Sequence, residues 1–125
     1  MIKSKDTTSS QELSEIIVKG IQEKKGTEIV ILNLKEVGNA IADFFVICTG
    51  NSDSQIDAIK ESIEKEVFLA TQQNPWHTEG HQNKQWVLLD YVDVVVHVFK
   101  KDLRHVFSLE ELWGDAALTY VDEAR

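Results

Sequence analysis

The chain has 125 residues, a formal net charge of −8 and a single cysteine, Cys48, so it fits one domain and cannot form an internal disulfide bond. Cys48 lies in an apolar run and is expected to be a buried, unreactive thiol. Asp and Glu outnumber Lys and Arg by 21 to 13, which disfavours tight nucleic-acid binding, because that requires several cations aimed at phosphates. Acidity favours a protein partner with a basic face, although it also serves solubility alone.

No apolar stretch approaches the ~20 residues that span a bilayer, so the sequence predicts a cytoplasmic protein with no membrane partner.

The first half of the chain predicts a helix followed by two strands. Ser9 and Glu12 have the spacing of a capping box, apolar residues then recur at helical intervals as far as Ile21, and the helix is expected to stop at Gly26. Residues 28–34 contain a β-branched run that is typical of a strand. Residues 42–49 are nearly all apolar, which indicates a second strand that is covered on both faces.

The second half of the chain begins with another helix and continues into a hairpin. Ser52 and Gln55 again have capping spacing, and the apolar stripe that follows predicts a long helix that ends before Pro75. Residues 86–89 and 94–99 predict two strands joined by a short turn. A short turn makes such a pair antiparallel.

These elements predict a single α/β domain with a mixed β-sheet flanked by helices. Two short helices are expected after the hairpin, at 102–107 and 108–114. We expect the domain to cover residues 9–114, with a flexible N-terminus at 1–8 and a C-terminal tail at 115–125.

The segment from Trp86 to Trp113 is rich in aromatic residues but carries no complete set of catalytic groups. This combination indicates a surface that docks on a partner more than a site of chemistry. Side chains alternate along a strand, so Val95, His97 and Phe99 share one face, while the opposite face is also apolar. Either helices cover both faces, or one face is a docking surface. Core packing is the competing interpretation for His97 and Trp113.

Three groups of polar residues could support chemistry, and each has a plainer structural interpretation. His77 and His81 have the spacing of a zinc pair on a helix, but the neighbouring proline and glycine disfavour a helix there. Asp90 and Asp93 could hold magnesium, but Asp at a hairpin tip more often shapes the turn. Residues 49–52 could offer backbone N–H groups to an anion, or could form a turn that caps the next helix. We therefore expect no metal, no cofactor and no catalytic residue.

Three separated segments carry a family resemblance: A-D-F-F-V-I-C-T-G-N-S at 42–52, W-V-L-L-D-Y-V-D-V-V-V-H-V-F at 86–99, and L-R-H-V-F-S-L-E-E-L-W-G-D-A at 103–116. In this order they resemble the ribosomal silencing factor family (RsfS, also called Iojap), over residues 11–116. The resemblance implies a nucleotidyltransferase-like fold and binding to the large ribosomal subunit through the subunit's protein fourteen. Such binding sterically hinders the small subunit and represses translation. The family is also tied to large-subunit assembly, and its free members often form homodimers.

The resemblance also implies which residues contact the partner. By position they are Trp86, His97, Phe99, Arg104, Phe107, Leu109, Glu110 and Trp113. Family members often carry Tyr where this chain has Phe107, and phenylalanine has no hydroxyl with which to make such a contact there. Two alternatives stay open: a metal-dependent nucleotidyltransferase that uses Asp90 and Asp93, and a homodimerising scaffold that does not bind ribosomes. A nucleotidyltransferase needs paired carboxylates to hold magnesium, and no Asp-x-Asp pattern follows the turn at Gly50.

Overall fold

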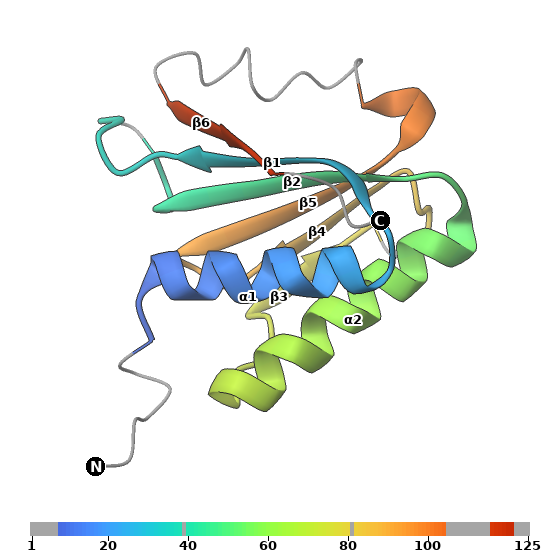
Figure 1. Ribbon diagram of the computed structural model, residues 1–125, viewed down its shortest axis with the longest axis horizontal. Coiled ribbons are helices and arrows are strands. Elements are labelled where there is room, and N and C mark those ends of the chain that lie inside the picture. The colour runs from blue at the N-terminus through green and yellow to red at the C-terminus, as the bar shows by residue number, and fades with distance from the viewer. Residues whose placement is uncertain (1–7, 39, 81, 105–115, 122–125) are drawn as a thin grey trace.

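The computed structural model describes residues 8–38, 40–80, 82–104 and 116–121. The elements in chain order (Figure 1) are α1 (Ser10–Glu23), β1 (Thr27–Asn33), β2 (Phe44–Gly50), α2 (Asp53–Thr71), β3 (His77–Glu79), β4 (Trp86–Asp90), β5 (Val94–Lys100), the 3-10 helix η2 (Lys101–Leu103) and β6 (Ala117–Tyr120). None of the helices in these ranges has the length and apolar character needed to cross a membrane.

The strands of the described residues form one mixed six-stranded sheet in the order β3-β4-β5-β2-β1-β6. β2 and β5 pair in parallel near its centre, and the other neighbouring pairs are antiparallel. The expected α/β fold with a mixed sheet is confirmed, and so is the antiparallel hairpin of β4 and β5. Because β2 and β5 are parallel, the chain between them, with α2, β3 and β4, must cross from one end of the sheet to the other.

Both α-helices begin where the capping spacings predict. Ser9 Oγ accepts a hydrogen bond from Glu12 N at 3.0 Å, and the Glu12 carboxylate accepts one from Ser9 N at 3.0 Å, which completes a capping box. Ser52 Oγ accepts a hydrogen bond from Gln55 N at 3.1 Å and caps α2. α2 ends at Thr71 and is followed by the capping residue Gln72, whose φ of 61° is left-handed.

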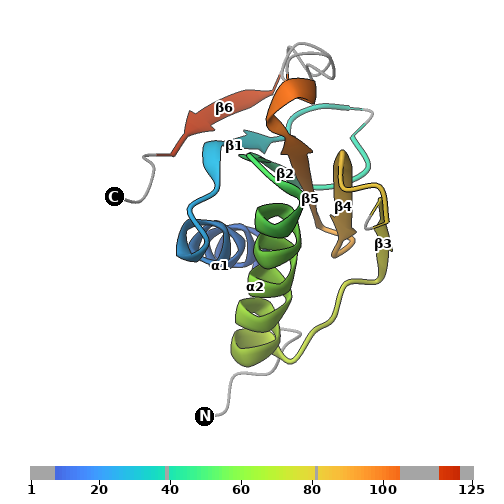
Figure 2. The same cartoon turned by 90° about the vertical axis from the view of Figure 1, so that its right-hand side faces the viewer.

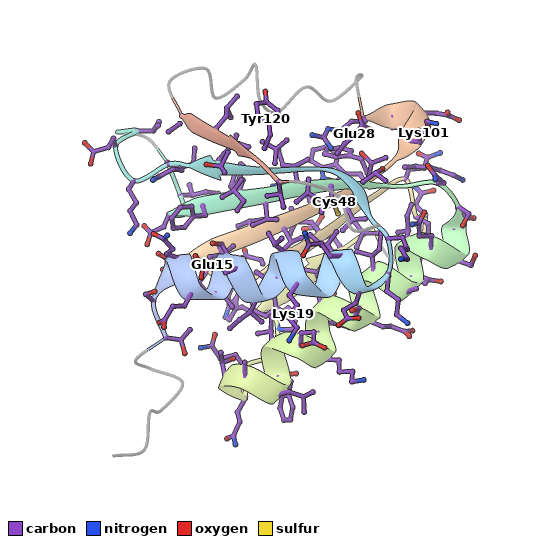
Figure 3. All side chains as sticks on the ribbon, in the orientation of Figure 1. Glu15, Lys19, Glu28, Cys48, Lys101 and Tyr120 are labelled. Carbon is purple, nitrogen blue, oxygen red and sulfur yellow. The ribbon has the colours of Figure 1, made fainter. Side chains whose placement is uncertain are left out.

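α1 and α2 lie on the same face of the sheet (Figure 2). Gly20 allows their close approach, since a Cβ atom at this position would lie 3.0 Å from Ile63 Cα. Ser62 Oγ donates a hydrogen bond to Gly20 O at 2.7 Å across the same contact. Between the two helices and the sheet lies the larger apolar core, which buries Cys48 (labelled in Figure 3). The other residues that β2, β4 and β5 contribute to this core are Phe44, Val46, Val87, Leu89, Val94, Val96 and Val98.

The opposite face of the sheet carries a second apolar core. Its buried residues are Val30, Leu32, Leu34, Phe45, Ile47, Val95 and Phe99. Trp86 and Leu88 pack half-buried against it. The alternation predicted for β5 is confirmed, because Val95 and Phe99 lie on this face while the intervening valines lie under the helices. The second face is thus the one that α1 and α2 leave uncovered.

The sheet extends past the expected domain boundary at residue 114. A tail is predicted over 115–125, and within this range Ala117–Tyr120 forms β6, which pairs antiparallel with β1. All four β6 side chains are exposed, so this strand is held by its backbone pairing with β1 and not by burial of its side chains. Of the two short helices expected after β5, the described part contains only η2, and residues 105–115 lie outside it, as do residues 1–7.

Candidate docking surface

An aromatic cluster occupies the second face of the sheet where β4 and β5 pair. The register sets Trp86 opposite Phe99 and Leu88 opposite His97. The rings of Trp86 and Phe99 stack with centroids 5.0 Å apart, and the rings of His97 and Phe45 meet edge to face at 4.7 Å. Aromatic pairs of this kind add about 0.5–1.5 kcal/mol each beyond the area they bury. The aromatic cluster is therefore a connected platform, in which each ring restrains its neighbours.

A hydrogen bond fixes the orientation of Trp86. Its indole Nε1 donates to His97 Nδ1 at 3.0 Å. Nδ1 must therefore be unprotonated, which places the proton of the neutral imidazole on Nε2. Burial lowers the pKa of His97 to about 4, so the ring is neutral near pH 7 and remains an acceptor for Trp86. Nε2 is buried and has no hydrogen-bond partner among the residues that the structure describes.

Arg104 anchors the chain at the same end of the second face. Its Nη1 donates to Glu28 O at 2.8 Å and to Thr49 Oγ1 at 3.1 Å. Thr49 pairs with Phe99 in the parallel register of β2 and β5, so the guanidinium lies beside the aromatic cluster. The Arg104 side chain is buried. It ties the turn after β5 to β1 and β2, and it thereby determines where the chain leaves η2.

The structure brings three of the eight expected contact residues together and places a fourth beside them. Trp86, His97 and Phe99 belong to the aromatic cluster, and Arg104 lies at its border. Trp86 is partly buried and keeps some exposed surface, whereas His97 and Phe99 are 4% and 0% exposed. Burial suits these two residues and Arg104 to positioning the surface better than to touching a partner. The other four expected contacts lie outside the described residues: Phe107, Leu109, Glu110 and Trp113.

Of the two carboxylates that were candidates for holding magnesium, Asp90 makes a structural contact, and so does Asp53 at the start of α2. Asp90 Oδ1 accepts a hydrogen bond from Val92 N at 2.7 Å and shapes the hairpin turn. Asp53 lies 2.8 Å from Lys100 Nζ, and this hydrogen bond holds the pKa of Asp53 below its ordinary value. The described ranges contain no cluster of three or more side chains that could hold a metal ion. The nucleotidyltransferase alternative therefore finds no assembled metal site in these ranges.

The polar turn before α2 satisfies its own backbone groups. Ser52 Oγ accepts from Gln55 N, and the Gln55 side chain accepts a hydrogen bond from Asn51 N at 2.6 Å. These side chains take two of the donors that an anion at this helix N-terminus would use. His77 Nε2 lies 2.7 Å from a neighbouring glutamate on β3, and its candidate zinc partner, His81, lies outside the described residues.

No sequence pattern reveals a further group of exposed apolar side chains, at the opposite end of β4 from Trp86. Ile41, Trp76 and Val92 are 81%, 76% and 56% exposed. They come from three segments that are far apart in the sequence, and the fold brings them together. The sequence offers one weak signal for this group: Trp76 and Val92 lie in turn segments, where Gly, Pro, Asn, Asp and Ser are the usual residues.

The fold and the aromatic cluster define the class: an α/β protein whose described helices cover one face of a mixed sheet and whose other face carries an aromatic platform. The sequence profile of the family described as "RsfS: Ribosomal silencing factor during starvation" matches residues 7–125. The chain therefore belongs to the ribosomal silencing factor family, which confirms the resemblance inferred from its three segments.

Individual relatives match over most of their length. Ribosomal silencing factor RsfS of Halalkalibacterium halodurans is 46% identical over 110 residues, which cover 86% of this chain and 91% of the relative. RsfS of Bacillus subtilis is 38% identical over 114 residues, which cover 91% of this chain and 95% of the relative. The crystal structure of a Chromobacterium violaceum protein matches with a TM-score of 0.79 at 28% identity, covering 93% of this chain and 95% of that chain. This chain and that protein thus share one fold.

Proposed function

We propose that this chain represses translation by binding the large ribosomal subunit through the subunit's protein fourteen and by sterically blocking the small subunit. The observation that supports this most directly is membership of a family described as silencing ribosomes during starvation. We place this action in the cytoplasm, and we include a role in assembly of the large subunit.

Occlusion requires affinity and position but no turnover. A folded domain held beside the surface where the two subunits meet excludes the small subunit by its volume alone. The net charge of −8 supports a basic partner, because opposite potentials speed encounter and fix orientation. The proposed mechanism therefore needs no catalytic residue, metal or cofactor.

Trp86 is the described residue best suited to anchor the partner. It keeps part of its surface exposed, its ring stacks on Phe99, and its N–H donates to His97. Binding hot spots favour tryptophan, and a side chain that is already held in place loses little freedom when it is buried. We assign His97, Phe99 and Arg104 to positioning this anchor. The remaining contacts in this proposal are Phe107, Leu109, Glu110 and Trp113.

The first test is co-sedimentation of the purified chain with isolated large and small ribosomal subunits. We expect the chain to pellet with large subunits and not with small ones. Trp86→Ala should weaken binding about tenfold, as expected of a hot-spot residue. Leu69→Ala is the matched control, since Leu69 is 69% exposed on α2 and its removal should leave binding unchanged. Failure of the wild-type chain to bind large subunits would contradict the proposed function.

A second measurement asks whether binding blocks subunit joining. Excess chain should lower the amount of joined ribosomes formed from purified subunits, as measured on a sucrose gradient. Trp86→Ala should need about tenfold more protein for the same effect. Binding that leaves joining unaffected would overturn occlusion as the mechanism.

We also propose that the free chain forms a homodimer, as the family resemblance implies. Light scattering of the purified protein tests this, and addition of ribosomal protein fourteen should reduce the dimer if both use the same surface. A monomer at all concentrations would remove this part of the proposal without affecting ribosome binding.

A further inference from the structure

Three exposed apolar side chains surround a concavity at the turn end of the β4–β5 hairpin. Ile41 lies in the link before β2, Trp76 in the link before β3, and Val92 in the hairpin turn. Together with Asp90 and Val95 they line a hollow of about 320 Å³. We call this hollow the turn-end pocket. Its volume is at the lower end of the range usual for pockets that hold small molecules, so a single large side chain fits it.

Backbone hydrogen bonds hold the walls of the turn-end pocket together. Trp76 N donates to Asp90 O at 2.7 Å, which fixes the tryptophan against the end of β4. Asp43 N donates to Asp93 O at 2.8 Å, which joins the link that carries Ile41 to the hairpin turn. The three exposed side chains are therefore presented by a connected backbone, and a partner would pay little entropy to order them.

Val92 occupies a backbone conformation that its side chain disfavours. Its φ is 75°, in the left-handed region that β-branched residues rarely adopt. A hydrogen bond from Asp93 N to Tyr91 O at 3.0 Å closes a three-residue turn around it. Glycine would suit this position better on backbone grounds alone. An exposed valine at a strained turn is an outlier of the kind that marks binding sites.

The segments that form the turn-end pocket carry acidic residues and no Lys or Arg. Asp43, Asp90 and Asp93 belong to the segments that form it, and Asp93 is exposed at the turn. Residues 40–44, 74–77 and 89–94 contain no Lys or Arg. An apolar hollow with carboxylates at its border complements a hydrophobic side chain that is flanked by basic residues.

We propose that the turn-end pocket binds a hydrophobic side chain carried on a basic polypeptide segment of the large ribosomal subunit, as a second contact beside the aromatic cluster. This inference rests on the proposed function. Trp86 and Asp90 are the two ends of β4, so the two contacts lie roughly 13 Å apart at about 3.3 Å per residue. A second copy of this chain is a poorer occupant, because two acidic borders would then face one another.

The experiment compares variants in co-sedimentation with isolated large subunits. Trp76→Ala should weaken binding about tenfold, while Leu69→Ala, an equally exposed apolar residue elsewhere, should bind like the wild type. Val92→Gly is the sharper variant, because it removes the apolar contact and relieves the strained turn at once. We expect it to bind about threefold more weakly while its thermal midpoint stays the same or rises. A misfolded variant cannot produce that combination.

Charge reversal tests the chemistry of the occupant. Asp93→Lys should weaken binding about fivefold at low salt, whereas Glu61→Lys, an exposed acid on α2, should change binding by much less. If the Trp76→Ala and Val92→Gly variants bind large subunits as tightly as the wild-type chain does, this inference is overturned and the proposed function is left intact. Absence of wild-type binding would overturn both. Variants that shift only the monomer–dimer balance in light scattering would show that a second copy is the occupant, and would overturn the inference as well.

Discussion

At the scale of single residues, His97 couples the Trp86 anchor to pH. Burial lowers the pKa of His97 to about 4, whereas an unperturbed histidine titrates near 6.5. Between these two values the unfolded chain binds a proton that the folded chain does not. Stability therefore falls as pH drops through this window. A protonated ring would also lose the Nδ1 acceptor that holds the Trp86 indole.

We predict that His97→Asn flattens the pH dependence of unfolding. The asparagine oxygen can accept a hydrogen bond but does not titrate. From about pH 6.5 down to about pH 4, the wild-type chain should lose about 3 kcal/mol more of its unfolding free energy than the variant loses. Urea titrations at several pH values measure this difference. Parallel losses in the two proteins would show that His97 does not titrate in this way.

Cys48 shows how burial acts on a different kind of group. Burial raises the pKa of the Cys48 thiol to about 12, and the nearby Arg104 guanidinium acts in the opposite direction. The thiolate is the reactive form of cysteine, so this thiol is poorly nucleophilic in the folded chain. The expectation of a buried cysteine is confirmed.

At the scale of elements, the contact between α1 and α2 depends on one small residue. A Cβ atom on Gly20 would lie 3.0 Å from Ile63 Cα and 3.2 Å from Ser62 O. Both neighbours belong to the α2 backbone, so relief requires movement of a whole helix. That strain, about 1–3 kcal/mol, exceeds the gain of about 1 kcal/mol that alanine brings to a helix interior.

We predict that Gly20→Ala lowers the free energy of unfolding by about 1 kcal/mol. Gly38→Ala is the matched control, because no atom lies within 4 Å of a Cβ built there, and it should change stability by less than about 0.5 kcal/mol. Urea unfolding of the two variants measures both values. If the Gly20→Ala variant were as stable as the wild-type chain, α2 would be able to shift freely, and the close approach of α1 and α2 would not be required.

Elements with local signals in the sequence could be predicted, and elements held only by distant contacts could not. Ser9 and Ser52 cap their helices as their spacing indicates. The alternation along β5 correctly separates the two faces of the sheet. β6 was missed because its side chains are exposed and it depends on backbone pairing with β1, a strand far away in the sequence.

The sequence predicted which residues of the candidate surface share a face, but it did not predict how deeply they are buried. Strand parity puts Val95, His97 and Phe99 on one face, and the structure confirms this for β5. Parity cannot show that His97 and Phe99 are buried, because burial depends on what else covers the face. The turn-end pocket was missed because Ile41, Trp76 and Val92 become neighbours only when the sheet has formed.

At the scale of the whole molecule, the net charge of −8 should act on the rate of encounter more than on the lifetime of the complex. We predict that raising the salt concentration from about 50 mM to about 300 mM slows association with large subunits several-fold, because the Debye length shrinks. Dissociation should change much less, since buried apolar contacts are not screened. Stopped-flow mixing with labelled subunits measures both rates. An association rate that does not depend on salt would argue against a basic partner.

The pairing of β6 with β1 has a consequence for aggregation. β1 carries Ile29, Val30 and Leu32, which are buried, and β6 occupies the side of β1 that would otherwise end the sheet. Unpaired N–H and C=O groups beside such an apolar strand are a template for pairing with other chains. β3 and β6, the strands at the two borders, are short, and short borders blunt this hazard. A chain truncated before Ala117 would expose β1 as a new edge strand. The four residues of β6 therefore protect the chain from self-association through backbone pairing with β1.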